Sequence, residues 1–185
     1  MTSHEGFSAA PQIRNDDEGL SLIELIMVVV LVGILSGVLV MILVNSWNAQ
    51  RDVSSTTVAT NEGQVFASSV ERAVRNAEAI EVTGGNVLRV RTTLPGERQC
   101  QFFRLTVSSG TADAAFMAFG SSAPAWPGPW ITEDVTAIGA APYFALGGGA
   151  VTYAFQVTTD SSPVLFQGRV AARNDVTAGG GAPCW

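Results

Sequence analysis

The sequence has 185 residues, of which 47% are hydrophobic and only 14% charged, and its formal net charge is −6. A charged fraction so far below the roughly 25% of ordinary soluble domains indicates that apolar residues are concentrated in one segment. An acidic chain is a poor partner for nucleic acid, because phosphate binding needs a basic surface. All ten basic residues are arginine, and the only histidine is His4. These absences exclude lysine Schiff bases and histidine-based catalytic triads, so we expect no enzyme, no cofactor and no metal site.

A stretch from Leu25 to Val44 carries no charge and is interrupted only by two glycines and a serine. As a helix it would be about 30 Å long, which matches the hydrocarbon thickness of a bilayer. A cleaved secretory signal is the alternative, but its apolar core is usually about 7–15 residues long, and residues 45–47 make a poor cleavage site. We therefore expect a transmembrane helix over residues 20–48.

Glu24 directly precedes this stretch, so its charge would lie near or within the membrane. A charged side chain near the bilayer centre costs about 2.5–3.5 kcal/mol on insertion scales, and less toward the interface. An intramembrane carboxylate is a candidate functional residue for this reason, whereas a carboxylate at headgroup level would need no special role.

The sequence Gly19-Leu20-Ser21-Leu22-Ile23-Glu24-Leu25, followed by the apolar stretch, closely resembles the N-terminal signal of type IV prepilins and pseudopilins. The resemblance covers residues 19–45. It implies that residues 1–19 are a cytoplasmic leader, that a prepilin peptidase cuts between Gly19 and Leu20, and that Leu20 becomes the methylated first residue. It also implies that Glu24 pairs with a new amino terminus during filament assembly. The chain departs from the family in having Glu18 before the glycine, where a basic residue is usual, and Leu20 in place of Phe or Met.

Beyond the membrane stretch, apolar residues recur at spacings near three and four, which predicts an amphipathic continuation of the helix over residues 49–82. The recurring residues are Val58, Val65, Phe66, Val70, Ala73, Ala77 and Ile80. Glu71 and Arg75 would lie one turn apart on the polar side. Gly63 and the polar run at 54–57 are weak helix formers, so two separate helices are the alternative.

From residue 83 to residue 185 the pattern changes to short strands separated by turn residues. Candidate strands are residues 87–91, 101–107, 114–119, 143–146, 151–157 and 164–172. We expect an α+β fold, in which a predominantly antiparallel β-sheet of four to six strands is laid on the long N-terminal helix.

Cys100 and Cys184 are the only cysteines. Both fall in the part of the chain expected outside the cytoplasm, where an even number of cysteines favours a disulfide; two free thiols are the alternative. Trp126, Trp130 and Trp185 are expected to anchor small apolar clusters, and contact with a carbohydrate ligand is the less favoured interpretation.

The resemblance implies a structural subunit, of the minor kind that primes assembly or sits at a filament tip, in a type IV pilus or related filament. Such a subunit is stored in the cytoplasmic membrane with a single pass and its C-terminus outside, and then enters an extracellular or periplasmic filament. Its partners would be other pilin subunits, the prepilin peptidase and the inner-membrane assembly platform. A pseudopilin of a type II secretion system and an extracellular binding domain on an uncleaved anchor are the alternatives. A tethered hydrolase fits less well, because removal of the leader also removes His4.

Overall fold

The computed structural model describes residues 21–106, 110–118, 120, 126–178 and 184–185. Its elements are α1 (Leu22–Arg75), β1 (Ala77–Thr83), β2 (Val87–Thr92), the short 3-10 helix η1 (Gly96–Arg98), β3 (Cys100–Thr106), β4 (Thr111–Met117), β5 (Pro129–Ile131), β6 (Val135–Thr136), β7 (Phe144–Gly147), β8 (Ala150–Val157), β9 (Val164–Ala171) and β10 (Thr177–Ala178). The expected α+β class is confirmed. The described chain divides into two units between Ser46 and Trp47. The expected leader, with Gly19 and Leu20, lies outside the described residues.

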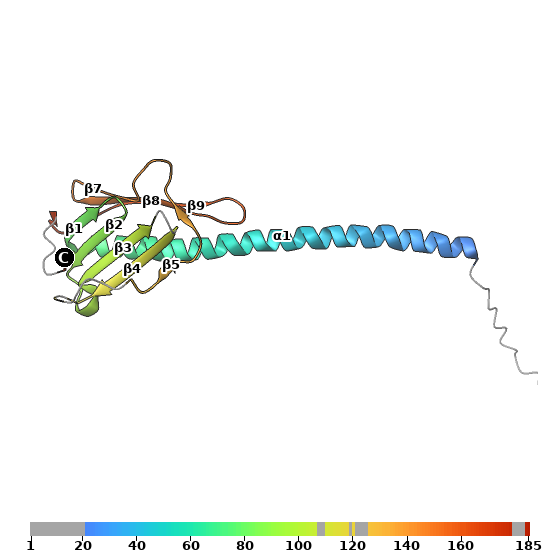
Figure 1. The fold of residues 1–185 in the computed structure, drawn as a ribbon, viewed down its shortest axis with the longest axis horizontal. Helices are drawn as coiled ribbons and strands as arrows, with labels where there is room; N and C mark the ends of the chain where they lie inside the picture. Colours follow the sequence, from blue (N-terminus) through green and yellow to red (C-terminus); the bar gives the residue numbers. More distant parts are fainter. Residues whose placement is uncertain (1–20, 107–109, 119, 121–125, 179–183) are drawn as a thin grey trace, which may run out of the picture. The chain divides into compact units, whose positions relative to one another are not determined.

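Helix α1 runs without interruption from Leu22 to Arg75 (Figure 1), so the alternative of two separate helices is wrong. The polar run at 54–57 does not break it, because threonine hydroxyls bond into the helix backbone: Thr56 donates to the Asp52 carbonyl at 2.8 Å and Thr57 to the Val53 carbonyl at 2.7 Å. The two hydroxyls thus find their acceptors within the helix and do not draw its backbone into a turn.

The helix ends earlier than residue 82, where the sequence pattern placed its end. The side-chain amide of Asn76 donates to the Arg72 carbonyl at 2.7 Å and so satisfies one of the last carbonyls of the helix. Strand β1 starts at the next residue. Ala77 and Ile80 are buried as expected, but as strand residues and not as part of a helical stripe.

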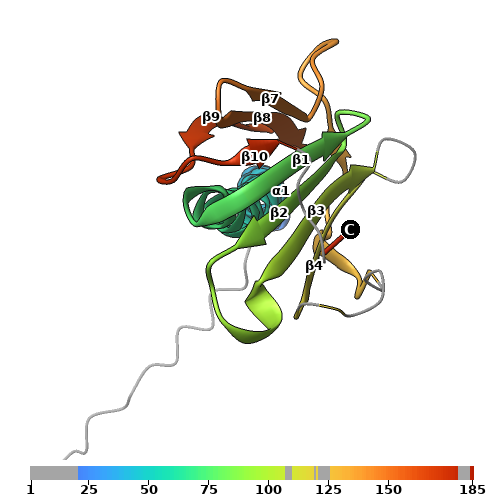
Figure 2. The ribbon, with the colours of Figure 1, turned by 90° about the vertical axis from the view of Figure 1, so that its left-hand side faces the viewer.

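Two sheets pack on the part of α1 from Ala59 to Arg75, which contains all its buried residues and which we call the packed segment. Sheet A has the strand order β10-β1-β2-β3-β4-β5 and is antiparallel except at the β1–β10 pair. In sheet B, β8 pairs with β9 along one edge and with β6 and β7 along the other. Figure 2 shows the two sheets flanking the helix. The expectation of one sheet of four to six strands is therefore incomplete, because the strands from β6 to β9 form a second sheet.

Phe66 joins the two sheets in one core. It is fully buried, and its ring meets Phe103 of β3 at a centroid distance of 5.8 Å and Phe155 of β8 at 5.7 Å, both edge to face. Val58 and Val65, expected on the buried stripe, are instead 39% and 57% exposed. The buried residues of α1 are Ala59, Gly63, Phe66, Ala67, Val70, Ala73 and Val74.

Gly63 allows β9 to approach the helix backbone. A Cβ atom at this position would overlap the ring of Phe166, which lies on β9. The Phe166 ring is itself stacked on Phe155 at a centroid distance of 5.1 Å, so it has little room to move. The glycine that weakens the helix in isolation thus permits its packing against sheet B.

We expect the substitution Gly63→Ala to destabilise the protein, although alanine is the better helix former by about 1 kcal/mol. Overpacking against Phe166 should lower the free energy of unfolding by about 1–3 kcal/mol. Denaturant unfolding of the full chain in detergent, followed by tryptophan fluorescence, measures this change.

Two further variants identify the cause. In a Phe166→Ala background the obstacle is gone, so Gly63→Ala should there be neutral or stabilising. Gly33→Ala is the matched control in the same helix, because no atom lies within 4 Å of a Cβ at Gly33. An equal loss of stability from Gly63→Ala in both backgrounds would show that Phe166 is not the reason for the glycine.

Candidate functional site

The first candidate feature is the apolar segment of α1, from Leu22 to Val44, which is about 35 Å long. Its large apolar side chains are all exposed within the described chain, from 48% at Val44 to 75% at Leu22. Mean hydropathy reaches 3.1 over 18 residues, and none of those residues is buried. This surface is far larger than the few hundred Å² of contiguous apolar surface that a soluble monomer exposes. The helix is therefore long and apolar enough to cross a membrane.

Glu24 is the only charged residue of the apolar segment. It lies in the first turn of α1, where the partial positive charge of the helix N-terminus favours a carboxylate. The side chain forms no ion pair with any other described residue. Leu25 and Val44, the expected limits of the uncharged stretch, both lie within α1.

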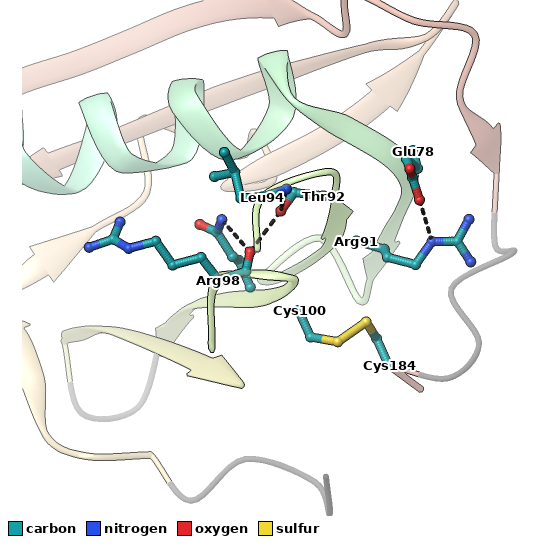
Figure 3. Close-up of a disulfide and its surroundings, with 8 residues drawn as sticks. Glu78, Arg91, Thr92, Leu94, Arg98, Cys100 and Cys184 are labelled. Carbon is teal, nitrogen blue, oxygen red and sulfur yellow. Dashed lines mark hydrogen bonds and ion pairs between the residues drawn. A yellow bond between two sulfur atoms is a disulfide. The ribbon is translucent and has the colours of Figure 1, made fainter. Parts of the chain in front are cut away.

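Cys100 of β3 and Cys184 form a disulfide (Figure 3), as the sequence predicts, and the two residues are 84 positions apart. The bond lies in a small apolar group on the face of sheet A opposite α1, because successive strand residues point to opposite faces and Phe103 faces the helix. We call this group the outer cluster: Cys100, Phe102, Ala115, Met117 and Cys184, with Trp126 and Trp185 packed against them. A disulfide is typical of an oxidising compartment.

The three tryptophans singled out in the sequence, Trp126, Trp130 and Trp185, all pack against other residues of the chain. The guanidinium carbon of Arg104 lies 4.2 Å from the centroid of the Trp126 ring. The ring centroids of Trp130 and Phe116 are 5.5 Å apart, and those of Trp185 and Phe102 are 6.2 Å apart. Arg104 is held in place by two hydrogen bonds to one oxygen of the buried Asp113 carboxylate, at 2.7 and 3.0 Å. These contacts favour an anchoring role for the tryptophans over contact with a carbohydrate.

Carboxylates of α1 tie the packed segment to the strands. Glu71 accepts a hydrogen bond from the Tyr153 hydroxyl at 2.7 Å and pairs with Arg75 at 2.9 Å. The pair with Arg75 was expected from the spacing, whereas the bond to Tyr153 was not. Glu62 accepts hydrogen bonds from the Thr132 backbone N–H at 2.8 Å and from its hydroxyl at 3.0 Å. Burial, followed by the hydrogen bond to Glu71, raises the pKa of Tyr153 above its ordinary value.

Comparison with known protein families, with curated proteins and with solved structures gives no match. In the described part of the chain, no three His, Cys, Asp or Glu side chains form a group that could hold a metal ion. A further feature that the sequence did not indicate is a hollow to which Arg72 of α1 and Arg98 of η1 both contribute. The features that bear on function are thus the apolar segment with Glu24, the outer cluster and this hollow.

We expect the double substitution of Cys100 and Cys184 by serine to lower the free energy of unfolding by about 2–4 kcal/mol, because the open chain has more conformational entropy when unfolded. Membrane insertion should not change, since the apolar segment is independent of the bond. Thermal unfolding in detergent and carbonate extraction of membranes measure the two properties. Ready alkylation of both thiols in the wild-type chain without reductant would contradict the disulfide.

We also expect a pH-dependent contribution from Tyr153. Its pKa in the folded state lies above the unfolded value of 10.0, so its stabilising effect is complete below that pH and is lost as the pH rises further. Tyr153→Phe should lower stability at neutral pH by about 1–2 kcal/mol, through loss of a hydrogen bond to a charged group. Above pH 10, the free energy of unfolding of this variant should decrease less steeply than that of the wild type.

Denaturant unfolding over a range from about pH 7 to about pH 11 tests this expectation. Tyr143→Phe is the control, because burial raises the pKa of Tyr143 without a carboxylate partner. In this variant, the decrease in the free energy of unfolding at high pH should be reduced less than in Tyr153→Phe. Equal slopes for Tyr153→Phe and the wild type would show that Tyr153 does not carry the effect.

Proposed function

We propose that this chain is a subunit, of the minor kind, of a type IV pilus or related filament. It is stored in the membrane and assembled through α1 after its leader is removed between Gly19 and Leu20. The observation that carries the proposal is the position of the Gly19–Leu25 pattern, which ends in the first turn of one continuous helix. That helix is apolar on all sides in its first part and covered by two sheets in its second part. A plain membrane anchor needs neither a glycine nor a glutamate at this spacing.

The proposed assembly follows from the chemistry of the apolar segment. A cut before this segment leaves it attached to the globular part. In a filament, contacts between the helices of many copies can then replace their contacts with lipid. The cut also creates a positively charged amino group on Leu20. Pairing of this group with Glu24 of a neighbouring copy offsets the desolvation of both charges. It also favours one axial stagger, because a shifted copy would leave Glu24 unpaired.

The proposal includes a location and a set of partners. The chain would cross the cytoplasmic membrane once, with the disulfide-bonded globular part outside, before it enters an extracellular or periplasmic filament. The prepilin peptidase would process it, and the inner-membrane assembly platform would join it to other pilin subunits. A pseudopilin of a type II secretion system would share all these properties and differ in the genes that surround it. A binding domain on an uncleaved anchor would differ in mass, because its chain would start at Met1 or Thr2 and not at methylated Leu20.

Substitutions of Glu24 test the proposal. Glu24→Leu removes the one charge of the apolar segment, so the monomer should insert into the membrane at least as well as the wild type. It should fail in assembly or in priming, because the amino terminus of Leu20 loses its partner. Glu24→Gln should fail as well, since an amide cannot supply the opposite charge. The measurement is the ratio of subunit in sheared filaments to subunit in membranes, or the number of filaments if the subunit primes them.

Asp52→Asn is the matched control, because it removes one negative charge from the same helix beyond the apolar segment. This variant should assemble normally. If both Glu24 variants assemble as well as Asp52→Asn, the pairing is absent and the plain anchor becomes the better interpretation.

A further inference from the structure

Two arginines from different elements face one hollow at the margin between α1 and sheet A. The hollow has a volume of about 280 Å³ and is lined by Ser68, Ser69, Arg72, Arg98, Gln101 and Phe116. Arg72 and the two serines lie near the C-terminal end of α1, Arg98 ends η1, and the other two residues lie on β3 and β4. Residues from four elements, α1, η1, β3 and β4, thus line this arginine hollow.

Arg98 is exposed, but both its side chain and its backbone have partners within the chain. Its guanidinium lies over the Phe116 ring at 5.6 Å from the centroid. Its backbone carbonyl accepts hydrogen bonds from the Thr92 hydroxyl at 2.7 Å and from the Gln101 amide at 2.9 Å, which fix the end of η1. Figure 3 shows the side chain extending away from the disulfide. Less conformational freedom is therefore lost when a ligand binds to it.

Arg72 and Arg98 have no carboxylate partner within ion-pair distance in the part of the chain that the structure describes. Glu71, the neighbour of Arg72 in the sequence, is bound to Arg75 and Tyr153 instead. By contrast, four other arginines of the packed segment and sheet A pair with carboxylates: Arg75, Arg89, Arg91 and Arg104. In a molecule of net charge −6, this hollow is a local concentration of positive charge.

We propose that the arginine hollow binds a phosphate group, either free or in a small phosphomonoester. At neutral pH a phosphomonoester carries a charge of about −1.5 to −2 and offers three acceptor oxygens, which matches two forked guanidinium donors. The Ser69 hydroxyl adds a further donor, whereas the Ser68 hydroxyl already donates to the Val65 carbonyl at 3.0 Å. A carboxylate has only one charge and two oxygens, so it offers the two guanidinium groups less negative charge and fewer acceptor atoms than a phosphate does. The Phe116 ring provides an apolar wall for the carbon part of an ester.

Isothermal titration calorimetry of the full chain in detergent, with inorganic phosphate in a low-salt buffer free of other oxyanions, tests this site. We expect a Kd on the order of 1 mM. Arg72→Gln and Arg98→Gln should each weaken binding roughly tenfold or more, because a charge-assisted hydrogen bond is lost. Arg98→Lys keeps the charge but loses the fork and the stacking, so its affinity should lie between those of the wild type and Arg98→Gln.

Arg169→Gln is the matched control, since it removes the same charge from an exposed position on β9 outside the hollow and should leave binding unchanged. Circular dichroism confirms that each variant is folded, and Ser69→Ala tests the site with both charges retained. Glycerol 3-phosphate distinguishes the two possible ligands. If this ester binds, the site accepts phosphomonoesters, and if only inorganic phosphate binds, the ligand is the free ion.

Three results would overturn the proposal. One is the absence of phosphate binding up to about 50 mM. Another is an equal loss of affinity in Arg169→Gln and in the two hollow variants, which would show a general effect of charge. The third is acetate binding as tightly as phosphate, which would exclude a phosphate site. The inference does not depend on the proposed filament function, because it rests only on the globular part.

Discussion

The globular part of this protein depends on one helix that packs against two sheets at once. Phe66 is the centre of this arrangement, because its ring touches Phe103 of sheet A and Phe155 of sheet B. Small sheets need a packing partner to bury an apolar face, and here one helix serves both. The packed segment is therefore the common core of the two sheets and not an appendage to either. The same helix also carries the apolar segment, so one element both forms the core of the globular part and presents a surface suited to a membrane.

The side chains of α1 differ between its apolar segment and its packed segment. The apolar segment is uniform, so it presents apolar atoms in all directions and suits lipid or other helices. The packed segment uses small residues where strands approach, with Gly63 as the extreme case, and carboxylates where the strands must be fixed in position. Glu62 and Glu71 each accept a hydrogen bond from a residue that lies far along the chain, 70 positions beyond Glu62 and 82 positions beyond Glu71. These bonds link parts of the chain that apolar contacts alone would fix less specifically.

Several features could be predicted from local sequence because they depend on local chemistry. The uncharged stretch from Leu25 to Val44 predicted a helix long and apolar enough to cross a membrane, and two cysteines in a part of the chain expected outside the cytoplasm favoured one disulfide. Strand β1 was missed because Ala77 and Ile80 continue a helical spacing; pairing with β2 overrides that pattern, as commonly happens for strands. The second sheet was missed because single strands do not reveal which neighbours they pair with. Arg72 and Arg98 could not be related at all, since only the fold brings their elements together.

The disulfide also determines how the globular part would respond to a pulling force. If tension is applied between α1 and Trp185, the covalent path runs along the chain to Cys100, crosses the sulfur bridge and leaves through Cys184. The 84 positions between the cysteines are then a closed loop that cannot lengthen, and at about 3.4 Å per residue they withhold about 290 Å of extension. Only α1, β1, β2 and η1 lie on the loaded path. Strands β3 to β10, which include all of sheet B, lie within the closed loop and are covalently shielded from the load. Reduction of this one bond would therefore greatly increase the extensibility of the molecule.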